Sequence, residues 1–356
     1  MQGLGERGMC DMPELRRDPV IGRWVIISTE RAKRPDQFSA SGVEAEGFAP
    51  DERCPFCEGN ESMTPPEIYA LRKPGSKPNG PGWDVRVIPS ISPLLQIEGN
   101  LDRHGHGMYD LMNAIGAHEI VIETPSHSRE SDIPKEQVTK SMNIIIDRVS
   151  DLEKDPRIKY ALIFKNYGQA AGGGHIKHSR LQIIGTPVNL KRVKEELAGA
   201  RRYYDYKDRC IFCDIIRQEL KTQARVTAES KEFIAIAPFA SRFPFETWIL
   251  PKAHSCDFYK IDREKLPDFV DILQLVFAKT RKVIGDFPFN FVLHAAPFRR
   301  DALKKGYWDT IERDYHWHFE ILPILTRVAG FEWGSGFYIN PLPPEDACKS
   351  VREAAA

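Results

Sequence analysis

Cys54-Pro55-Phe56-Cys57 recurs in the second half of the chain as Cys210-Ile211-Phe212-Cys213, and each of these Cys-x2-Cys turns is followed by two histidines in the same order. Such a turn supplies two thiolates, and two imidazoles from later strands complete the tetrahedral donor set that zinc prefers. Because the order of donors repeats, the sequence indicates an internal duplication with one zinc site in each half. The expected ligands are Cys54, Cys57, His127 and His178 in the first half, and Cys210, Cys213, His254 and His316 in the second.

A different grouping of the later histidines is also compatible with the sequence. His294, His316 and His318 could bind another metal ion together with Glu195 or Glu196, and His316 cannot serve both sites. We favour the two tetrads, because each has a complete Cys2His2 donor set. Structural sites of this kind leave no position open for substrate, so we expect both zinc ions to be structural. Without a metal, the cysteines would pack as small hydrophobic side chains and the histidines would make local hydrogen bonds.

Length and charge limit the class of protein. A chain of 356 residues is long enough for two domains of medium size, each with its own core. Its 50 basic and 50 acidic residues cancel, so we expect no nucleic-acid or membrane partner, and any phosphate site has to be local. The apolar runs are too short to span a bilayer and residues 1–11 lack a signal-peptide core, which predicts a cytoplasmic protein.

The pattern of apolar residues predicts an α+β fold. In the first half, apolar residues at helical spacing over 134–152 precede a strand at 160–164 and a glycine-rich turn at 168–174. The second half repeats this order, with a helix over 266–283 before a strand at 290–293. A charged stretch that is expected to be helical separates the halves. The expected domains are residues 1–195 and residues 196–356.

Several longer motifs resemble those of one known family. The most specific is His-Trp-His-Phe-Glu-Ile at 316–321, which is followed by Ala-Gly-Phe-Glu-Trp-Gly-Ser-Gly-Phe-Tyr-Ile-Asn-Pro at 329–341. The other motifs lie at 18–25, 31–35, 54–57, 210–216, 243–245, 251–254 and 294–298. Over nearly its whole length the chain resembles the galactose-1-phosphate uridylyltransferases of the histidine-triad superfamily.

This resemblance implies a fold, a reaction and partners. The fold would be a duplicated half-barrel of antiparallel strands with flanking helices, assembled as a homodimer with active sites near the subunit interface. The partners would be a nucleotide or nucleotide sugar and a sugar phosphate. In the family's double displacement, a histidine of a His-Pro-His-x-Gln motif attacks the α-phosphorus of UDP-glucose, holds UMP covalently and passes it to galactose 1-phosphate. The first histidine of that motif binds zinc, and the glutamine supports the phosphoryl oxygens.

The chain departs from that motif at the nucleophile. Residues 178–182 read His-Ser-Arg-Leu-Gln, which keeps the zinc histidine and Gln182 but places Arg180 where the attacking imidazole would be. A guanidinium stays protonated at physiological pH and has no lone pair that can attack phosphorus. Its planar donors can hold phosphate oxygens, so we expect Arg180 to bind phosphate rather than only to be solvated or paired with a carboxylate.

Three replacements for the lost nucleophile remain open. His175 lies where the family usually has a serine that contacts phosphate, although a histidine in such a loop more often makes hydrogen bonds or faces solvent. His318 occupies, in the second half, the position of Arg180 in the first, but the family's repeat is degenerate there. In the third case, phosphate, a sugar phosphate or water attacks directly and the protein only stabilises charge. The residues expected to do so are Arg31, Arg34, Arg180 and Gln182.

The substrate-binding positions are partly changed. Ser90-Ile91-Ser92 stands where the family carries an asparagine and an aromatic residue that hold the nucleoside, which weakens the case for uridine. Asn166 is kept, and so are Phe331 and Glu332 on the sugar-phosphate side. We therefore expect a zinc-containing nucleotidyltransferase that acts on a nucleotide sugar or sugar phosphate without the covalent His-UMP step. The alternatives are a nucleotide-sugar phosphorylase or hydrolase, or a non-catalytic nucleotide-binding sensor.

Overall fold

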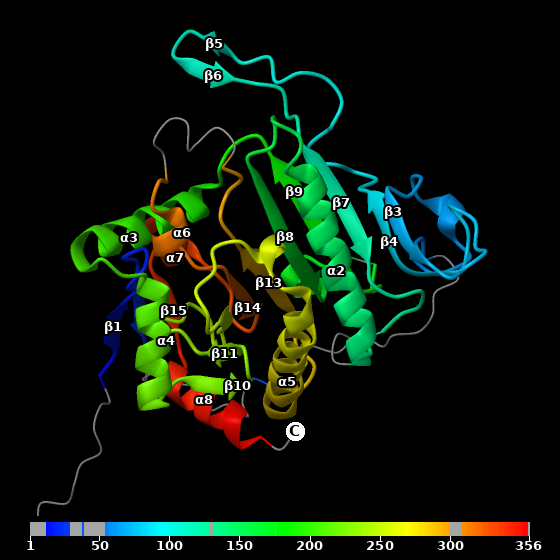
Figure 1. Cartoon of the computed structure of the whole chain (residues 1–356). Coiled ribbons are helices and arrows are strands. Elements are labelled where there is room, and N and C mark those ends of the chain that lie inside the picture. The colour runs from blue at the N-terminus through cyan, green and yellow to red at the C-terminus, as the bar shows by residue number, and fades with distance from the viewer. Residues whose placement is uncertain are drawn as a thin grey trace, which may run out of the picture.

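The structure is a computed structural model that describes residues 12–28, 38, 54–128, 132–174, 176–299 and 308–354. Three residues that the sequence analysis singled out, Arg31, Arg34 and His175, lie outside the described residues. Figure 1 shows one large sheet with helices packed along it and a hairpin arm that projects at the top. None of the described helices has both the length and the apolar character needed to cross a membrane.

The main sheet of the described chain has ten strands in the order β10-β11-β12-β14-β13-β8-β9-β7-β4-β3, and neighbouring strands are antiparallel. The strands of the first half are β3 (Tyr69–Arg72), β4 (Trp83–Pro89), β7 (Ala117–Ile122), β8 (Tyr160–Tyr167) and β9 (Arg180–Thr186). Those of the second half are β10 (Val226–Glu229), β11 (Phe233–Ile236), β12 (Thr247–Pro251), β13 (Phe289–His294) and β14 (His318–Pro323).

The strand order is symmetrical about the centre of the sheet, where β8 and β13 pair with Asn166 opposite Asn290. Outward from that pair, β8, β9, β7, β4 and β3 of the first half correspond to β13, β14, β12, β11 and β10 of the second. This order confirms the duplicated α+β fold that the sequence predicts. The domain boundary between residues 195 and 196 falls inside α3 (Lys191–Lys207) and stays a prediction.

One face of the sheet is covered by α2 (Lys135–Leu152) and α5 (Leu266–Ile284), which lie side by side and come one from each half (Figure 1). Their apolar residues recur every three or four positions, so each helix turns an apolar stripe toward the sheet. In α2 this stripe includes Val138, Met142 and Ile145, all buried in the main core. Because strand side chains alternate, every second strand residue packs under these helices and the others point to the opposite face.

The remaining elements pack mainly around the second half (Figure 1). A three-stranded sheet consists of β1 (Glu14–Arg17), β2 (Trp24–Ile27) and β15 (Tyr338–Asn340). The helices are α4 (Ile211–Thr222), α6 (Ile311–Asp314), α7 (Gly330–Ser335) and α8 (Pro344–Glu353), and short 3-10 turns are η2 (Glu61–Met63), η4 (Gln169–Ala171), η5 (Phe258–Lys260) and η6 (Arg263–Lys265). The hairpin of the arm is formed by β5 (His104–His106) and β6 (Tyr109–Leu111).

Candidate functional site

The first predicted tetrad comes together at the end of the sheet's first half. One ligand atom from each of its four residues lies within 4.8 Å of the others. The Nδ1 atom of His178 is 3.7 Å from the sulfur of Cys54 and 3.6 Å from that of Cys57. On the other side of the ring, Nε2 donates to the carbonyl oxygen of Thr124 at 2.7 Å. Burial lowers the pKa of His178 to about 4, so the ring is neutral at physiological pH.

The second predicted tetrad repeats this arrangement. Its four ligand atoms also lie within 4.8 Å of one another. The sulfur of Cys213 is 3.3 Å from Nδ1 of His254 and 3.7 Å from Nδ1 of His316, and both rings donate from Nε2 to a backbone carbonyl. Hydrogen bonds from Cys210, His254 and His316 lower the pKa of the Cys213 thiol. The site therefore favours a thiolate, which is the form that binds metal.

Both donor sets fit a tetrahedral zinc ion. With Zn–S near 2.3 Å and Zn–N near 2.0 Å, a sulfur and a nitrogen on the same ion are about 3.5 Å apart. The sulfur–nitrogen distances of 3.3 to 3.7 Å match this separation. The backbone carbonyls accept hydrogen bonds from Nε2 of His178, His254 and His316 and so hold each ring with Nδ1 turned toward the sulfurs, an arrangement that is usual for histidines that bind a metal. Each set is complete, so a bound zinc ion would hold the fold and leave no position for substrate.

His316 lies in the second tetrad, away from the other predicted histidine group. That group is a separate buried cluster made of Glu196, His294, His318 and Glu320. Both carboxylate oxygens of Glu196 are within 2.9 Å of Nδ1 of His294. The sequence had left His316 open between two sites. In the structure His316 lies just before β14 and joins the second tetrad, whereas His318 is the first residue of β14 and joins the buried cluster.

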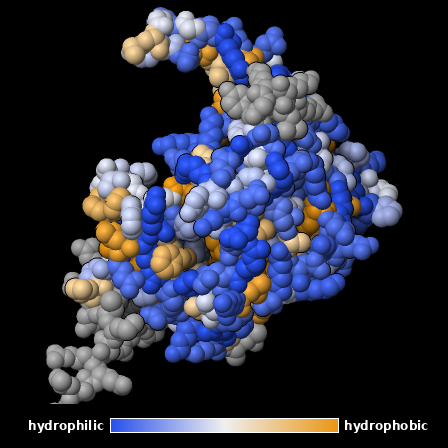
Figure 2. Space-filling model, turned by 60° about the vertical axis from the view of Figure 1, so that its left-hand side comes forward, coloured by the Kyte–Doolittle hydropathy of each residue, from blue (hydrophilic) through white to orange (hydrophobic). Residues whose placement is uncertain are grey.

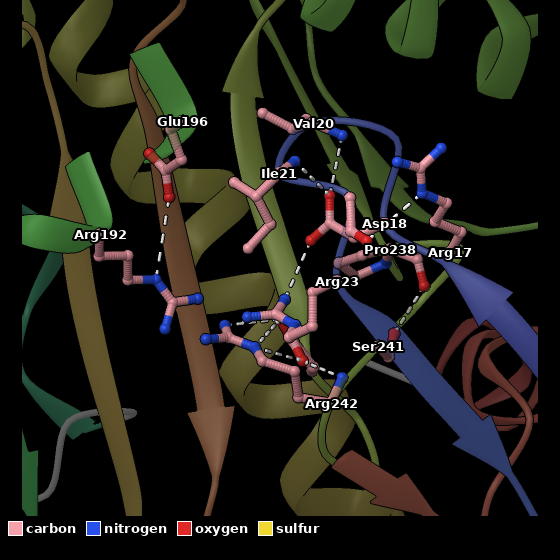
Figure 3. A network of polar contacts seen from close by, with 12 residues as sticks. Arg17, Asp18, Val20, Ile21, Arg23, Arg192, Glu196, Pro238, Ser241 and Arg242 are labelled. Atoms are coloured by element: carbon pink, nitrogen blue, oxygen red, sulfur yellow. Dashed lines mark hydrogen bonds and ion pairs between the residues drawn. The ribbon is translucent and has the colours of Figure 1, made fainter. Parts of the chain in front are cut away.

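A buried charge network, unforeseen from the sequence, closes this cluster. The guanidinium of Arg242 donates to Glu246 at 2.8 Å and to Glu320 at 2.7 Å, and all three side chains are almost fully buried. Figure 3 shows the turn of residues 17–23 lying against Arg242, with Arg192 and Glu196 on the other side. The only signal in the sequence was two charged residues, Arg242 and Glu246, within the largely apolar run 233–250. His318, which belongs to the cluster beside this network, is only 1% exposed, and burial lowers its pKa to about 4.

A pocket of about 830 Å³ opens at the end of β8 and β9. Its walls are the glycine-rich turn after β8, the segment 176–180 and the segment 324–328. Basic side chains on the wall are Lys165, Lys177, Arg180 and Arg327, and apolar ones include Tyr167, Phe243, Phe287 and Leu325. A space with a basic side and an aromatic side has the character needed to hold the phosphates and the base of a nucleotide.

Arg180 forms part of the pocket wall and braces the glycine-rich turn. Its Nη1 donates to the carbonyls of Ile176 at 2.7 Å and His178 at 3.1 Å, and its Nη2 donates to that of Gly173 at 2.6 Å. The turn needs a glycine at 173, because a Cβ there would lie 2.8 Å from the carbonyl oxygen of Gly168. The guanidinium therefore ties the turn to the strand that follows the zinc histidine.

Of the other predicted binding residues, Asn166 lines the pocket and accepts a hydrogen bond from Asn290 at 2.7 Å. Gln182 points away from the helices on β9, where His118 Nε2 donates to its side-chain oxygen at 3.0 Å, and it is not part of the pocket wall. Ser90 follows β4 at the base of the arm. Phe331 and Glu332 lie in α7, and Phe331 is half exposed.

The structure joins Lys165 and Ser179, which line the pocket floor, to the fully buried Glu123, a triad that the sequence did not indicate. The ammonium of Lys165 donates to Glu123 at 2.5 Å and to Ser179 Oγ at 2.7 Å, and Ser179 Oγ donates to Glu123 at 2.7 Å. The side chains of Lys165 and Glu123 are 2% and 0% exposed. Ser179 stands between His178 and Arg180, so this triad holds the segment that joins the first tetrad to the pocket. The only signal in the sequence was a lysine directly after the apolar strand at 160–164.

Comparison with known proteins identifies relatives of this chain. Residues 196–345 match the galactose-1-phosphate uridyl transferase C-terminal domain, and residues 105–188 match the N-terminal domain of a family of unknown function, DUF4931. An ADP-glucose phosphorylase of Arabidopsis thaliana is 36% identical over 356 residues, which is 99% of this chain and 96% of that protein. A galactose-1-phosphate uridylyltransferase of Thermotoga maritima is 28% identical over 96% of this chain and 98% of its own.

Solved structures agree with the sequence matches. The crystal structure of an ADP-glucose phosphorylase from Arabidopsis thaliana with bound ADP-glucose has a TM-score of 0.79 and 34% identity, over 97% of this chain and 100% of that one. A uridylyltransferase structure has a TM-score of 0.72 and 25% identity, over 96% of this chain and 98% of that one. The chain belongs to the galactose-1-phosphate uridylyltransferase family of the histidine-triad superfamily, as a divergent member in which Arg180 stands in place of the nucleophilic histidine.

Proposed function

We propose that the protein is a zinc-containing nucleotidyltransferase that cleaves a nucleotide sugar at its α-phosphorus by direct attack of inorganic phosphate. The observation that carries this proposal is Arg180, a permanently charged pocket residue at the position of the family's nucleophile. The name of the Arabidopsis relative, ADP-glucose phosphorylase, supports phosphate as the acceptor. A nucleoside diphosphate and a sugar 1-phosphate would be the products.

The chemistry requires positioning and charge more than proton transfer. An oxygen of phosphate forms a bond to the α-phosphorus while the bond to the oxygen of sugar 1-phosphate breaks on the opposite side. The leaving group is a phosphate ester that departs as an anion, so no acid has to protonate it. Lys177, Arg180 and Arg327 on the pocket wall would stabilise the negative charge of the transition state. His318 is buried behind Arg242 and does not reach the pocket wall, which supports a step without a protein nucleophile.

The two tetrads would each hold one zinc ion through Cys54, Cys57, His127 and His178, and through Cys210, Cys213, His254 and His316. Zinc would act there as a cross-link between the Cys-x2-Cys turns and the strand ends. The first site would also fix His178, two residues before Arg180, and so the wall of the pocket. We further propose that the protein is a homodimer, as the family resemblance implies.

The proposal is tested with ADP-glucose and UDP-glucose that carry a label on the α-phosphate, each incubated with the zinc-loaded protein with and without inorganic phosphate. We expect labelled nucleoside diphosphate and glucose 1-phosphate only when phosphate is present, and no acid-labile label on the protein. Label on His175 or His318 would show a relocated nucleophile and overturn direct attack. Release of labelled nucleoside monophosphate without phosphate would show a hydrolase instead.

A nucleotide-binding sensor is the second candidate. The guanidinium of Arg180 already donates to three backbone carbonyls, and an arginine held in this way can shape a binding pocket without taking part in a reaction. A sensor would bind ADP-glucose or UDP-glucose without product in any combination of phosphate or galactose 1-phosphate. Isothermal titration beside the turnover assay separates the two candidates.

A further inference from the structure

Asp286 stands alone as an acidic residue among the described residues that line the pocket. It lies between α5 and β13 and is half-buried. In the described part of the chain no basic side chain pairs with its carboxylate, and the hydroxyl of Tyr167 donates to it at 3.0 Å. Because a carboxylate has about four acceptor positions, most of this capacity is left for a ligand in the pocket.

Packing on both sides fixes the position of this carboxylate. The ring of Tyr167 stacks on that of Phe289, with 5.0 Å between the ring centres. A Cβ on Gly168 would lie 2.9 Å from the Cβ of Pro288, so the glycine-rich turn packs directly on the segment that carries Asp286. An acceptor held in this way loses little conformational freedom when a ligand binds, and this favours affinity.

Asp286 lies away from the part of the pocket that would hold the phosphates. In the sheet, β8 separates β9 from β13. Two inter-strand spacings, about 10 Å in all, therefore lie between the strand that begins with Arg180 and the strand that follows Asp286. A carboxylate repels phosphate oxygens, so the phosphates belong beside Lys177 and Arg180, and Asp286 faces an uncharged part of the ligand.

The surroundings of Asp286 suit a sugar better than a base. The face of the molecule drawn in Figure 2 is mostly hydrophilic, whereas Tyr167 and Phe287 line the pocket beside Asp286. A hexose has a face of C–H groups that packs on such rings, and each hydroxyl on its edge can donate to a carboxylate. Uracil offers one donor between two carbonyl oxygens, which would meet the negative charge, and adenine offers one amino group. A group that only accepts hydrogen bonds therefore favours the sugar.

We propose that Asp286 is a specificity-determining residue that accepts hydrogen bonds from hydroxyl groups of the sugar of the nucleotide sugar. The hydroxyl of Tyr167 holds the carboxylate in the orientation in which its remaining acceptor positions face the sugar. The ligand class is thus a nucleoside diphosphate joined to a hexose with free hydroxyls on the side that meets Asp286. This inference rests on the proposed function, since it assigns a position to the sugar of the substrate named there.

The test is titration calorimetry of ADP, UDP, ADP-glucose and UDP-glucose with the zinc-loaded wild type, Asp286→Ala and the control Asp271→Ala. Asp271 lies on α5 outside the pocket wall, and its side chain is 54% exposed. We expect Asp286→Ala to weaken binding of the better nucleotide sugar about 10- to 100-fold, the effect of losing a hydrogen bond to a charged group. Binding of the matching nucleoside diphosphate should stay unchanged or become slightly tighter, because a negative charge leaves the pocket. The control should bind all four ligands as the wild type does.

Three outcomes overturn the inference, and they differ in meaning. An equal loss for the nucleotide sugar and the nucleoside diphosphate shows that Asp286 contacts the base or the ribose. No loss for either ligand shows that Asp286 contacts neither part. A wild type that binds neither nucleotide sugar rejects the proposed function and the inference together. Nucleotide-sugar binding that depends on Asp286 but gives no phosphate-dependent product supports the inference and rejects only the proposed reaction.

If Asp286→Ala unfolds earlier than the control, analogues of the better nucleotide sugar that each lack one sugar hydroxyl decide. With the wild type, at least one analogue should bind about tenfold more weakly than the complete ligand, because the carboxylate loses its donor. Asp286→Asn, which keeps one acceptor oxygen, should reduce that difference. Equal affinity of the wild type for all analogues refutes the inference.

Discussion

Replacing Lys165 by methionine tests the triad on the pocket floor. The substitution keeps the length of the side chain but removes the ammonium that donates to Glu123 and to Ser179. The carboxylate of Glu123, whose side chain is fully buried, would then lose the ammonium that it pairs with in the interior. Breaking a buried ion pair by removing one partner costs about 3–5 kcal/mol of unfolding free energy. We expect a loss in this range.

The measurement is chemical unfolding of the zinc-loaded protein, followed by tryptophan fluorescence. The double variant Lys165→Met/Glu123→Leu removes both charges, so it should lose less than Lys165→Met alone. Its remaining loss should be about 1–3 kcal/mol, because the substitutions remove two hydrogen bonds of the buried Ser179 hydroxyl. A single variant that loses under about 1 kcal/mol, or a double variant as unstable as the sum of both singles, would show that the charges are not coupled as the geometry indicates.

Four other results follow from the same structure. Elemental analysis should find close to two zinc ions per chain, and Cys54→Ser or Cys210→Ser should each remove about one and lower the unfolding free energy, whereas less than one ion in protein never exposed to chelator contradicts both tetrads. Arg180→Ala should weaken nucleotide-sugar binding by about 1.5–3 kcal/mol in titration calorimetry, while the surface control Arg201→Ala leaves it unchanged. Arg180→His should not restore uridylyl exchange, because the segment at 90–92 also departs from the family, and measurable exchange would show that the rest of the site is intact. Burial opposes ionisation of Glu345, but hydrogen bonds from two arginines keep its pKa below the ordinary 4.5. The stability that the ionised Glu345 contributes is therefore present above that pH and is lost as the pH falls through the lowered pKa. Glu345→Gln should flatten the acid side of the curve of unfolding free energy against pH.

The duplicated fold was predictable because its signals are local and repeat along the chain. The Cys-x2-Cys turns, the helical spacing in 134–152 and 266–283 and the strands around them recur in one order in both halves. Apolar periodicity specifies which face of an element is buried, and two copies of one pattern specify a symmetrical sheet. The pairing of β8 with β13 at the centre follows the same symmetry.

The sequence by itself determined the donor types of both tetrads, the family and the loss of the nucleophile at Arg180, since each depends on residue identity and order. Only the tertiary structure decided that His316 joins the tetrad, that Arg180 braces the glycine-rich turn, and that Lys165 meets Glu123 on the pocket floor. The tetrad and the pair of Lys165 with Glu123 join strand ends that lie tens of residues apart in the chain, and the turn is closed onto Arg180 only when β8 and β9 pair. Their partners are selected by how strands pair and helices pack, and spacing along the sequence does not carry that information.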